Sequence, residues 1–361
     1  MKNWEGDVEK PVVSICSITY NHERYIEEAI DSFLMQETNF PFEILIDEDF
    51  STDNTAKKIK PYIEKYPQII KANLRKKNIG AMANFLASMK RAQGKYIALC
   101  EGDDYWTDTN KLQKQVDFLE KNLDYGLVCT DMVKYIQKDK TFIDSNIIPL
   151  GQSYPTTMTA KGYVYEELMI GKSQIWTLTV CFRNSLLDDM PILDSAKVFT
   201  GDALLYMHIA LKSKIKYFQD KTAVYRVLEE SASHSKDPVK SLRFLYQIAN
   251  LLLYFLEKHP INPQLHQIVF YRSMFNRFRF ALASENYDVF KTVRLELPSN
   301  LYIKIAGLKI SYSEIAALKI LYLLCQWKPF FEILSRLYKK RIYAPYVVVK
   351  KQDSQLEKVS S

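Results

Sequence analysis

The sequence predicts an α/β fold with a mostly parallel central sheet, flanked by helices, and an α-helical C-terminal extension. Over residues 11–130, apolar runs alternate with amphipathic segments about every 30 residues, the spacing of strand–helix–strand units with right-handed crossovers. Beyond Pro238 the apolar pattern becomes helical. Because 361 residues exceed one typical core, we expect two domains, residues 1–235 and residues 236–361.

The first half of the chain supplies the strands and helices of the parallel sheet. Val12–Thr19 is a β-branched apolar run, and Tyr25–Met35 then repeats apolar residues at helical spacing. Tyr96–Cys100 is apolar throughout, which indicates a central strand buried on both faces. The same patterns predict strands at Glu43–Asp47, Ile69–Leu74 and Leu127–Thr130, and helices at Ala56–Tyr66, Ala83–Arg91 and Lys111–Lys121.

The rest of the chain is less regular. Residues 140–172 are interrupted by Pro and Gly, so we expect loops and short helices there. Farther on, the patterns predict strands at Gln174–Phe182, Ile215–Phe218 and Ala223–Val227, and helices at Asp202–Lys212, Ser241–His259, Gln264–Ser284, Tyr287–Glu296 and Tyr312–Lys340.

The composition is that of a globular protein, with 47% apolar and 25% charged residues. The five cysteines have no paired spacing, which favours buried, reduced thiols over disulfides or a zinc site. We find no signal peptide and no apolar window of about 18 residues, the length that spans a membrane. We therefore expect a cytoplasmic protein.

Positive charge gathers in the C-terminal region. Residues 236–361 hold 20 Lys and Arg against 9 Asp and Glu, although the whole chain has a net charge of only +7. Lys and Arg beside the apolar, aromatic run Ile320–Phe331 are typical of a helix on an anionic membrane surface, here the inner face of the plasma membrane. A helical bundle packed on the catalytic domain is the favoured structure for this pattern, and it is compatible with membrane binding if one helix stays partly exposed. No nucleic-acid-binding fingerprint is present.

Three carboxylates, Glu101, Asp103 and Asp104, follow the predicted central strand. Two carboxylates about 5 Å apart repel by roughly 3 kcal/mol at an effective dielectric constant of 20, so the cluster favours a counter-ion. A divalent cation such as Mg²⁺ or Mn²⁺, shared with substrate phosphates, fits this cluster. The alternative is a solvated acidic turn.

The loops after neighbouring parallel strands should face the same crevice. Thr19, Tyr20 and Asn21 follow the first strand, and Glu48 and Asp49 follow the second. Asp49 can accept hydrogen bonds from a base or ribose, and the Tyr20 ring can lie against the base. Capping of the next helix is the alternative for the two carboxylates. The glycine-rich motifs of dinucleotide-binding folds and P-loops are absent, which disfavours both chemistries.

Together these segments resemble an inverting family 2 glycosyltransferase with a GT-A fold, of the bacterial surface-polysaccharide type. The resemblance covers about residues 11–235 and rests on five segments: Val13–Asn21, Glu43–Thr55, Asn78–Asn84, Gly94–Trp106 and the helix that contains Lys111 and Leu112. It implies transfer of a hexosyl or N-acetylhexosaminyl group from a nucleoside diphosphate sugar to a hydroxyl acceptor, with Mn²⁺ or Mg²⁺ as cofactor. The basic C-terminal region suggests a lipid-linked oligosaccharide as that acceptor.

The resemblance also implies roles for individual residues. Asp202 is the expected general base, with helix capping as the alternative. Asp103 and Glu101 are expected to hold the metal, and His234 to complete its shell unless it is a plain surface residue. Nucleotide-binding roles are expected for Thr19, Tyr20, Asn21, Glu48, Asp49, Asn78, Gly80, Glu101, Asp104 and Arg226, the last as a bidentate phosphate ligand.

Two positions depart from the family pattern, since Glu101 stands where Asp is usual and Phe50 where Gly is common.

The sequence leaves two alternative functions for the chain. A sugar nucleotidyltransferase uses a similar sheet, but it needs a Gly-rich basic loop that residues 20–24 do not supply. An inactive nucleotide-sugar-binding scaffold of a polysaccharide assembly complex has no need of the retained carboxylates.

Overall fold

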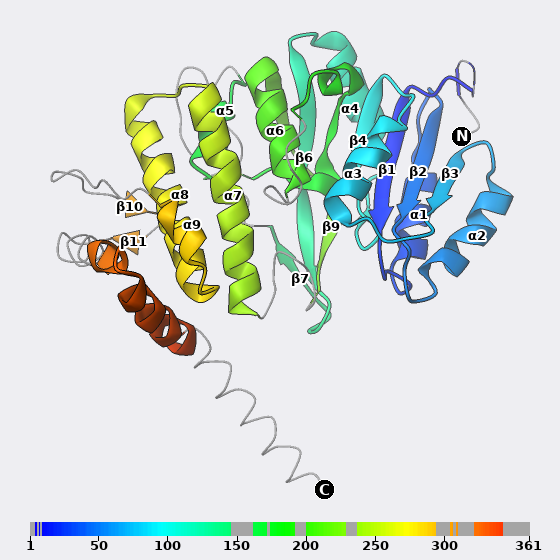
Figure 1. The fold of residues 1–361 in the computed structure, drawn as a ribbon. Helices are drawn as coiled ribbons and strands as arrows, with labels where there is room; N and C mark the ends of the chain where they lie inside the picture. Colours follow the sequence, from blue (N-terminus) through cyan, green and yellow to red (C-terminus); the bar gives the residue numbers. More distant parts are fainter. Residues whose placement is uncertain are drawn as a thin grey trace, which may run out of the picture. The chain divides into compact units, whose positions relative to one another are not determined.

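The computed structural model of the chain describes residues 4–5, 7, 9–145, 162–171, 174–191, 200–228, 237–293, 304–305, 308–309 and 321–341. The chain divides into two compact units. Residues 1–196 and 200–228 belong to the first, and residues 197–199 and 229–361 to the second. The first unit contains the large sheet, and the second is mainly helical (Figure 1).

One sheet runs through the first unit in the order β3-β2-β1-β4-β8-β6-β9-β5. One half is parallel and consists of β1 (Val13–Thr19), β2 (Phe42–Glu48), β3 (Ile70–Leu74) and β4 (Tyr96–Leu99). The other half is mixed and consists of β5 (Tyr105–Trp106), β6 (Tyr125–Ile136), β8 (Cys181–Arg183) and β9 (Lys214–Val227), with β7 (Thr141–Asp144) paired to β6. The prediction of a central β4 is therefore confirmed.

Helices cover both faces of this sheet. One face carries α1 (Ile26–Leu34), α2 (Thr55–Lys65) and α4 (Lys111–Lys121), and the other carries α3 (Ala81–Lys90) and α6 (Gly201–Lys212). The reason is visible in β4, where Tyr96 and Ala98 pack with the first group and Ile97 and Leu99 with the second. Side chains alternate along a strand, so a strand that is apolar throughout needs cover on both faces.

Several predicted strands differ from the structure. Most of Gln174–Phe182 is not a strand, because residues Thr177–Thr179 form a 3₁₀ turn and only β8 follows. The Leu178 carbonyl of that turn accepts the indole N–H of Trp106 at 2.8 Å, outside any strand ladder. The two strands predicted at 215–218 and 223–227 are one continuous strand, β9. Within 140–172 lie β7 and α5 (Tyr165–Met169), and residues 146–161 are outside the described part.

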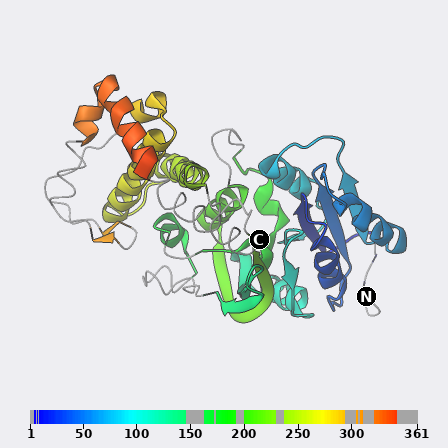
Figure 2. The same cartoon turned by 90° about the horizontal axis from the view of Figure 1, so that it is seen from below.

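In the second unit, α7 (Pro238–Lys258) and α8 (Pro263–Ala283) lie side by side in both views (Figure 2), and α9 (Tyr287–Lys291) follows. Side chains of Asp237 and Asn262 cap the two long helices, each with Pro in the first turn. The predicted helices are thus confirmed there, although the third is shorter than predicted. Of the helix predicted at Tyr312–Lys340, residues 321–325 and 328–340 are helical, residues 326–327 are not, and residues 312–320 lie outside the described part. A short hairpin of β10 (Lys304–Ile305) and β11 (Leu308–Lys309) was not predicted.

All five cysteines are buried, and none forms a disulfide, as predicted. Within the ranges that the structure describes, we find no helix with the length and apolar character needed to cross a membrane.

Lys111 in α4 is a buried cation of the first unit. Its side chain is 1% exposed, its Nζ donates to Oε1 of Gln115 at 2.9 Å, and Nζ lies 4.3 Å from the centre of the Trp106 ring. Burial lowers the pKa of Lys111 to about 8. The charged form is therefore less favourable in the folded protein than in the unfolded chain.

We expect the free energy of unfolding to rise with pH between the folded and unfolded pKa values of Lys111, about 8 and about 10.4. In this window the unfolded chain holds a proton that the folded protein has released. Lys111→Met keeps the contact with Trp106 but has no charge. Between these two pKa values, the free energy of unfolding of the wild type should therefore rise by about 3 kcal/mol relative to that of the variant. Urea unfolding of both proteins at neutral pH and near pH 10 measures this, and the comparison cancels the titration of other groups. A difference that stays constant with pH argues against the effect.

Candidate active site

The turn after β4 brings together the carboxylates of Glu101, Asp103 and Asp104. One oxygen from each lies within 4.8 Å of the others. The backbone N–H of Asp104 donates to the carbonyl of Glu101 at 3.1 Å, and that of Gly102 donates to the carbonyl of Ile18 at 3.0 Å. The turn is therefore tight and is joined to the end of β1, as expected for neighbouring parallel strands.

Gly102 permits this close approach between the turn and β1. A Cβ atom at this position would lie 2.6 Å from Oγ1 and 2.8 Å from Cβ of Thr19, which is closer than atoms can pack. Thr19 is 2% exposed, and its Oγ1 is 3.2 Å from Nδ1 of His22. Thr19 thus supports the turn, and a contact between Thr19 and a nucleotide base stays a prediction.

Burial and mutual repulsion disfavour negative charge on the cluster. Burial raises the pKa of Glu101, and the nearby carboxylates of Asp103 and Asp202 raise it further. The pKa of Asp104 is raised by burial, and then by Asp103 and Glu101. A divalent cation would remove this repulsion, so these oxygens suit a hard metal ion.

His22 is a neighbour of the cluster that the sequence analysis did not single out. Its Nε2 lies 3.8 Å from Oδ2 of Asp103. The available signal was its position directly after Thr19-Tyr20-Asn21, in the loop at the carboxyl end of β1.

Asp202 reaches the same cluster from the first turn of α6. Its carboxylate is close enough to Glu101 to raise the pKa of Glu101. The N–H of Ala203 donates to Oδ1 of Asp202 at 2.8 Å and lowers the pKa of Asp202, but burial has the larger effect and the net change is upward. The N-cap of α6 is Thr200, so Asp202 lies inside the helix and not at the capping position. Asp202 therefore satisfies an N–H of the first turn of α6, and its role as the general base stays a prediction.

The loop after β2 is held by Asp49. Its two carboxylate oxygens accept the N–H groups of Ile79 and Gly80, both at 2.9 Å, and Asn78 Nδ2 donates to its carbonyl at 2.9 Å. Gly80 has a φ of 86°, a conformation that glycine adopts at little cost. Asp49 is 2% exposed, and its Oδ1 also lies 4.0 Å from Nε of Arg75. Asp49 therefore joins this loop to the start of α3, and its contact with a nucleotide stays a prediction.

Two other predicted residues also hold loops. Glu48 Oε1 accepts the N–H of Ser51 at 2.6 Å, and Asn21 Oδ1 accepts that of Thr52 at 2.9 Å. Phe50, where the family pattern has Gly, adopts a φ of 61° at a cost of about 1–2 kcal/mol. Tyr20 is 42% exposed and so presents a free ring surface.

Arg226 of β9 contacts the acidic turn directly. Its Nη1 donates to the carbonyl of Asp103 at 2.9 Å, and its backbone N–H donates to Oδ1 of Asp104 at 2.7 Å. These contacts are with protein groups, and the expected phosphate contact is still only a prediction. His234, the expected additional metal ligand, lies outside the described residues.

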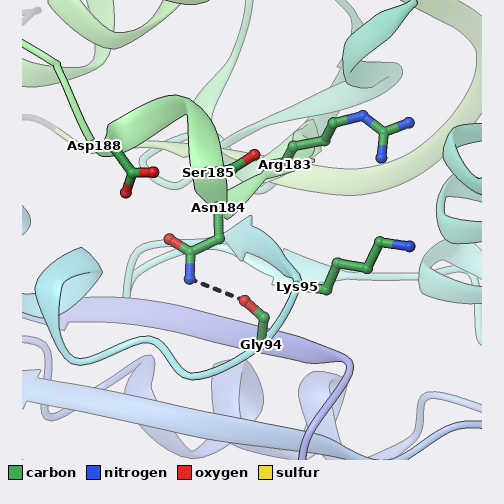
Figure 3. A pocket seen from close by; sticks show the side chains of 6 residues that line it. All are labelled: Gly94, Lys95, Arg183, Asn184, Ser185 and Asp188. Atoms are coloured by element: carbon green, nitrogen blue, oxygen red, sulfur yellow. Dashed lines mark hydrogen bonds between the residues drawn. The ribbon is translucent and has the colours of Figure 1, made fainter. Parts of the chain in front are cut away.

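A pocket of about 310 Å³ lies near the opposite end of β4 (Figure 3). Its lining consists of Gly94, Lys95, Arg183, Asn184, Ser185 and Asp188. Gly94 and Lys95 precede β4, whereas the acidic turn follows it, and Asn184 Nδ2 donates to the Gly94 carbonyl at 2.9 Å. No predicted site residue lines this pocket, so the candidate active site is the acidic cluster.

Residues 14–183 match the family model described as glycosyl transferase family 2. The chain is 38% identical over 224 residues to the uncharacterized protein Rv1520 of Mycobacterium tuberculosis, which covers 62% of this chain and 61% of that protein. It is 36% identical over 119 residues to TuaG of Bacillus subtilis, named for teichuronic acid biosynthesis, which covers 33% of this chain and 44% of TuaG. The match thus spans about three fifths of the length of Rv1520.

Two solved structures share the fold. TarS 1–349 of S. aureus, in complex with UDP-GlcNAc, has a TM-score of 0.54 at 20% identity and covers 91% of this chain and 90% of that one. The mannosyltransferase PcManGT of Pyrobaculum calidifontis, in complex with GDP-Man and Mn²⁺, has a TM-score of 0.52 at 15% identity, covering 93% and 89%. At such low identity the likeness establishes the architecture alone.

Proposed function

The chain carries a family 2 glycosyltransferase domain with the GT-A fold, and from this premise we propose that it transfers a sugar from a nucleoside diphosphate sugar to a hydroxyl acceptor with inversion. The observation that carries the proposal is the acidic cluster of Glu101, Asp103 and Asp104 at the carboxyl end of β4, with Asp202 near enough to Glu101 to raise the pKa of Glu101. A base and an acidic, cation-binding cluster are the two functions that this reaction requires. The name of TuaG supports a place in surface-polysaccharide biosynthesis.

Asp202 accepts the proton of the acceptor hydroxyl as that oxygen bonds to the anomeric carbon. The bond from this carbon to the diphosphate oxygen breaks, and the diphosphate leaves with the bonding electrons. One displacement of this kind inverts the anomeric configuration. Burial raises the pKa of Asp202, which makes its carboxylate a stronger base.

We propose that Asp103 and Glu101 hold Mn²⁺ or Mg²⁺, with Asp104 in support. A bound divalent cation would neutralise the negative charge of the departing diphosphate. The Mn²⁺ in the PcManGT complex supports an ion of this class. The exposed ring of Tyr20 and the carboxylate of Asp49 are proposed to bind the nucleoside.

A thermal-shift screen tests donor binding. The ligands are UDP-GlcNAc, UDP-glucose and GDP-mannose, each with Mn²⁺ and with a chelator. A ligand that binds only the folded protein raises Tm by mass action. We expect one nucleotide class to raise Tm, and to do so more with Mn²⁺. The absence of a shift with every nucleotide at millimolar concentration is incompatible with the proposed donor site.

We also propose that the second unit binds an anionic membrane at the inner face of the plasma membrane, which would bring the protein to a lipid-linked oligosaccharide acceptor. The mostly helical segment 321–341 exposes five large apolar side chains, namely Leu323, Leu324, Trp327, Ile333 and Leu337. The same segment exposes the basic residues Lys328, Arg336, Lys340 and Arg341. Phe331 and Ser335 are buried, so bundle packing accounts for one face of the segment and leaves the other unexplained.

The protein should sediment with vesicles that contain anionic lipid, and less so as salt rises, because each Lys or Arg near the surface contributes about 1 kcal/mol and is screened by ions. Trp327→Ser combined with Leu337→Ser should weaken binding. Leu123→Ser, at a position 78% exposed in the first unit, is the matched control and should bind as the wild type does. Equal binding to neutral and anionic vesicles, or none to either, would exclude this role for the basic segment.

A further inference from the structure

We propose that Arg226 is a positioning residue that fixes the acidic turn in its metal-binding shape, and that it is not a ligand of the donor diphosphate. The proposal rests on the proposed function, because it takes the turn at Glu101–Asp104 to be the metal site. Three sets of contacts carry it: those to the turn, those around the guanidinium, and those of the strand that bears it.

Arg226 fixes two consecutive residues of the turn through two different groups. Its Nη1 donates to the main-chain oxygen of Asp103 at 2.9 Å. Its backbone N–H donates to the Oδ1 carboxylate oxygen of Asp104 at 2.7 Å. The first contact orients the backbone from which the Asp103 side chain projects, and the second orients a neighbouring carboxylate. Loss of the side chain removes only the first.

The guanidinium is enclosed by protein on its remaining sides. Arg226 is 5% exposed, and its Nη2 is paired with Glu28 of α1. The guanidinium carbon lies 5.1 Å from the ring centre of Tyr25 and 4.6 Å from that of Tyr105. A phosphate ligand needs a guanidinium edge that faces the substrate with two free N–H groups. Here each terminal nitrogen already donates one N–H to a protein oxygen, two aromatic rings lie against the guanidinium, and Arg226 is too deeply buried to present an edge to a phosphate.

The strand that bears Arg226 is also joined to the turn. β5, which begins directly after Asp104, pairs antiparallel with β9 through Tyr105 and Val224. β9 in turn pairs with β6, where Arg226 lies opposite Tyr135. The acidic turn is thus held at one end by β4 and at the other by β5 and Arg226. Small displacements of the Asp103 backbone would change the ligand geometry that a metal requires.

The test measures Mn²⁺ binding by electron paramagnetic resonance of the free ion, without nucleotide and without turnover. Arg226→Lys keeps the charge but lacks the planar fork that serves Asp103, Glu28 and both rings together. We expect it to raise the Mn²⁺ dissociation constant about 10- to 100-fold, as for other residues that orient metal ligands. Glu28→Gln removes the ion pair between the guanidinium and Glu28, whose side chain is 54% exposed, and should raise the Mn²⁺ dissociation constant about two- to fivefold. Lys95→Gln lies remote from the turn, so it is the control and should leave the Mn²⁺ dissociation constant unchanged.

A second readout separates positioning from phosphate binding. UDP or GDP affinity, whichever the screen identifies, is measured in chelator and should be the same for Arg226→Lys, Glu28→Gln and the wild type. Unchanged Mn²⁺ binding with weaker nucleotide binding would overturn the proposal and make Arg226 a donor ligand. If Arg226→Lys does not fold, Glu28→Gln decides, and an unchanged Mn²⁺ affinity overturns the proposal. A wild type that binds no Mn²⁺ overturns the metal site itself, whereas equal Mn²⁺ binding by all proteins overturns only the role of Arg226.

Discussion

Asp202→Asn should lower kcat by about 10²- to 10⁴-fold, the usual contribution of a positioned general base, with donor affinity nearly unchanged. The amide has the shape of the carboxylate but cannot take the acceptor proton. Because burial raises the pKa of Asp202, the ionised form is costly in the folded protein, and a neutral amide should keep or raise Tm. Steady-state kinetics at varied donor and acceptor concentrations, with Tm measured in parallel, test both statements.

Asp139→Asn is the matched control for this change, since Asp139 is an exposed residue between β6 and β7 and lies outside the candidate site. It should have the kcat of the wild type. If Asp202→Asn lowers Tm while each folded molecule turns over at the normal rate, Asp202 is a structural residue of α6 and the base must be sought elsewhere.

Asp103→Asn should abolish metal-dependent transfer. An amide oxygen is a poor substitute for a carboxylate on a hard cation, and loss of several kcal/mol of charge stabilisation corresponds to a fall in kcat of about 10³-fold. The Asp103 side chain is 21% exposed, so the change leaves the core intact. Rates measured over a Mn²⁺ titration, with a chelator baseline, give the result. A variant with near-normal turnover in chelator would remove Asp103 from the metal site.

The parallel half of the sheet could be predicted because the apolar pattern of its strands is visible in the sequence. Residues 96–99 are apolar at each position, and in the structure each is at most 1% exposed, with helices on both faces. The mixed half carries no such signal. β8 has only three residues, and its direction beside β4 is set by tertiary contacts, such as Arg183 Nε donating to the Tyr125 carbonyl at 2.9 Å.

Some features of the candidate site could likewise be predicted from the sequence, and others could not. That Glu101 and Asp103 would lie at one edge of the sheet follows from strand order alone. That Asp202 comes near Glu101 across about a hundred positions of sequence was expected from the family resemblance, not from any pattern in the residues. The role of Asp49 in holding Ile79 and Gly80 could not be predicted, because a buried carboxylate that accepts backbone N–H groups has the same local sequence as one that faces a ligand.

The most direct test of the account is the rate at which wild-type protein releases nucleoside diphosphate from the donor identified by screening, in the presence of acceptor. The account predicts release with Mn²⁺, a fall to background when chelator is added, and recovery with excess Mn²⁺. It also predicts that Asp202→Asn, loaded with the same Mn²⁺, stays at least about 100-fold slower. Release that continues unchanged in chelator, or that Asp202→Asn sustains at the wild-type rate, would contradict it.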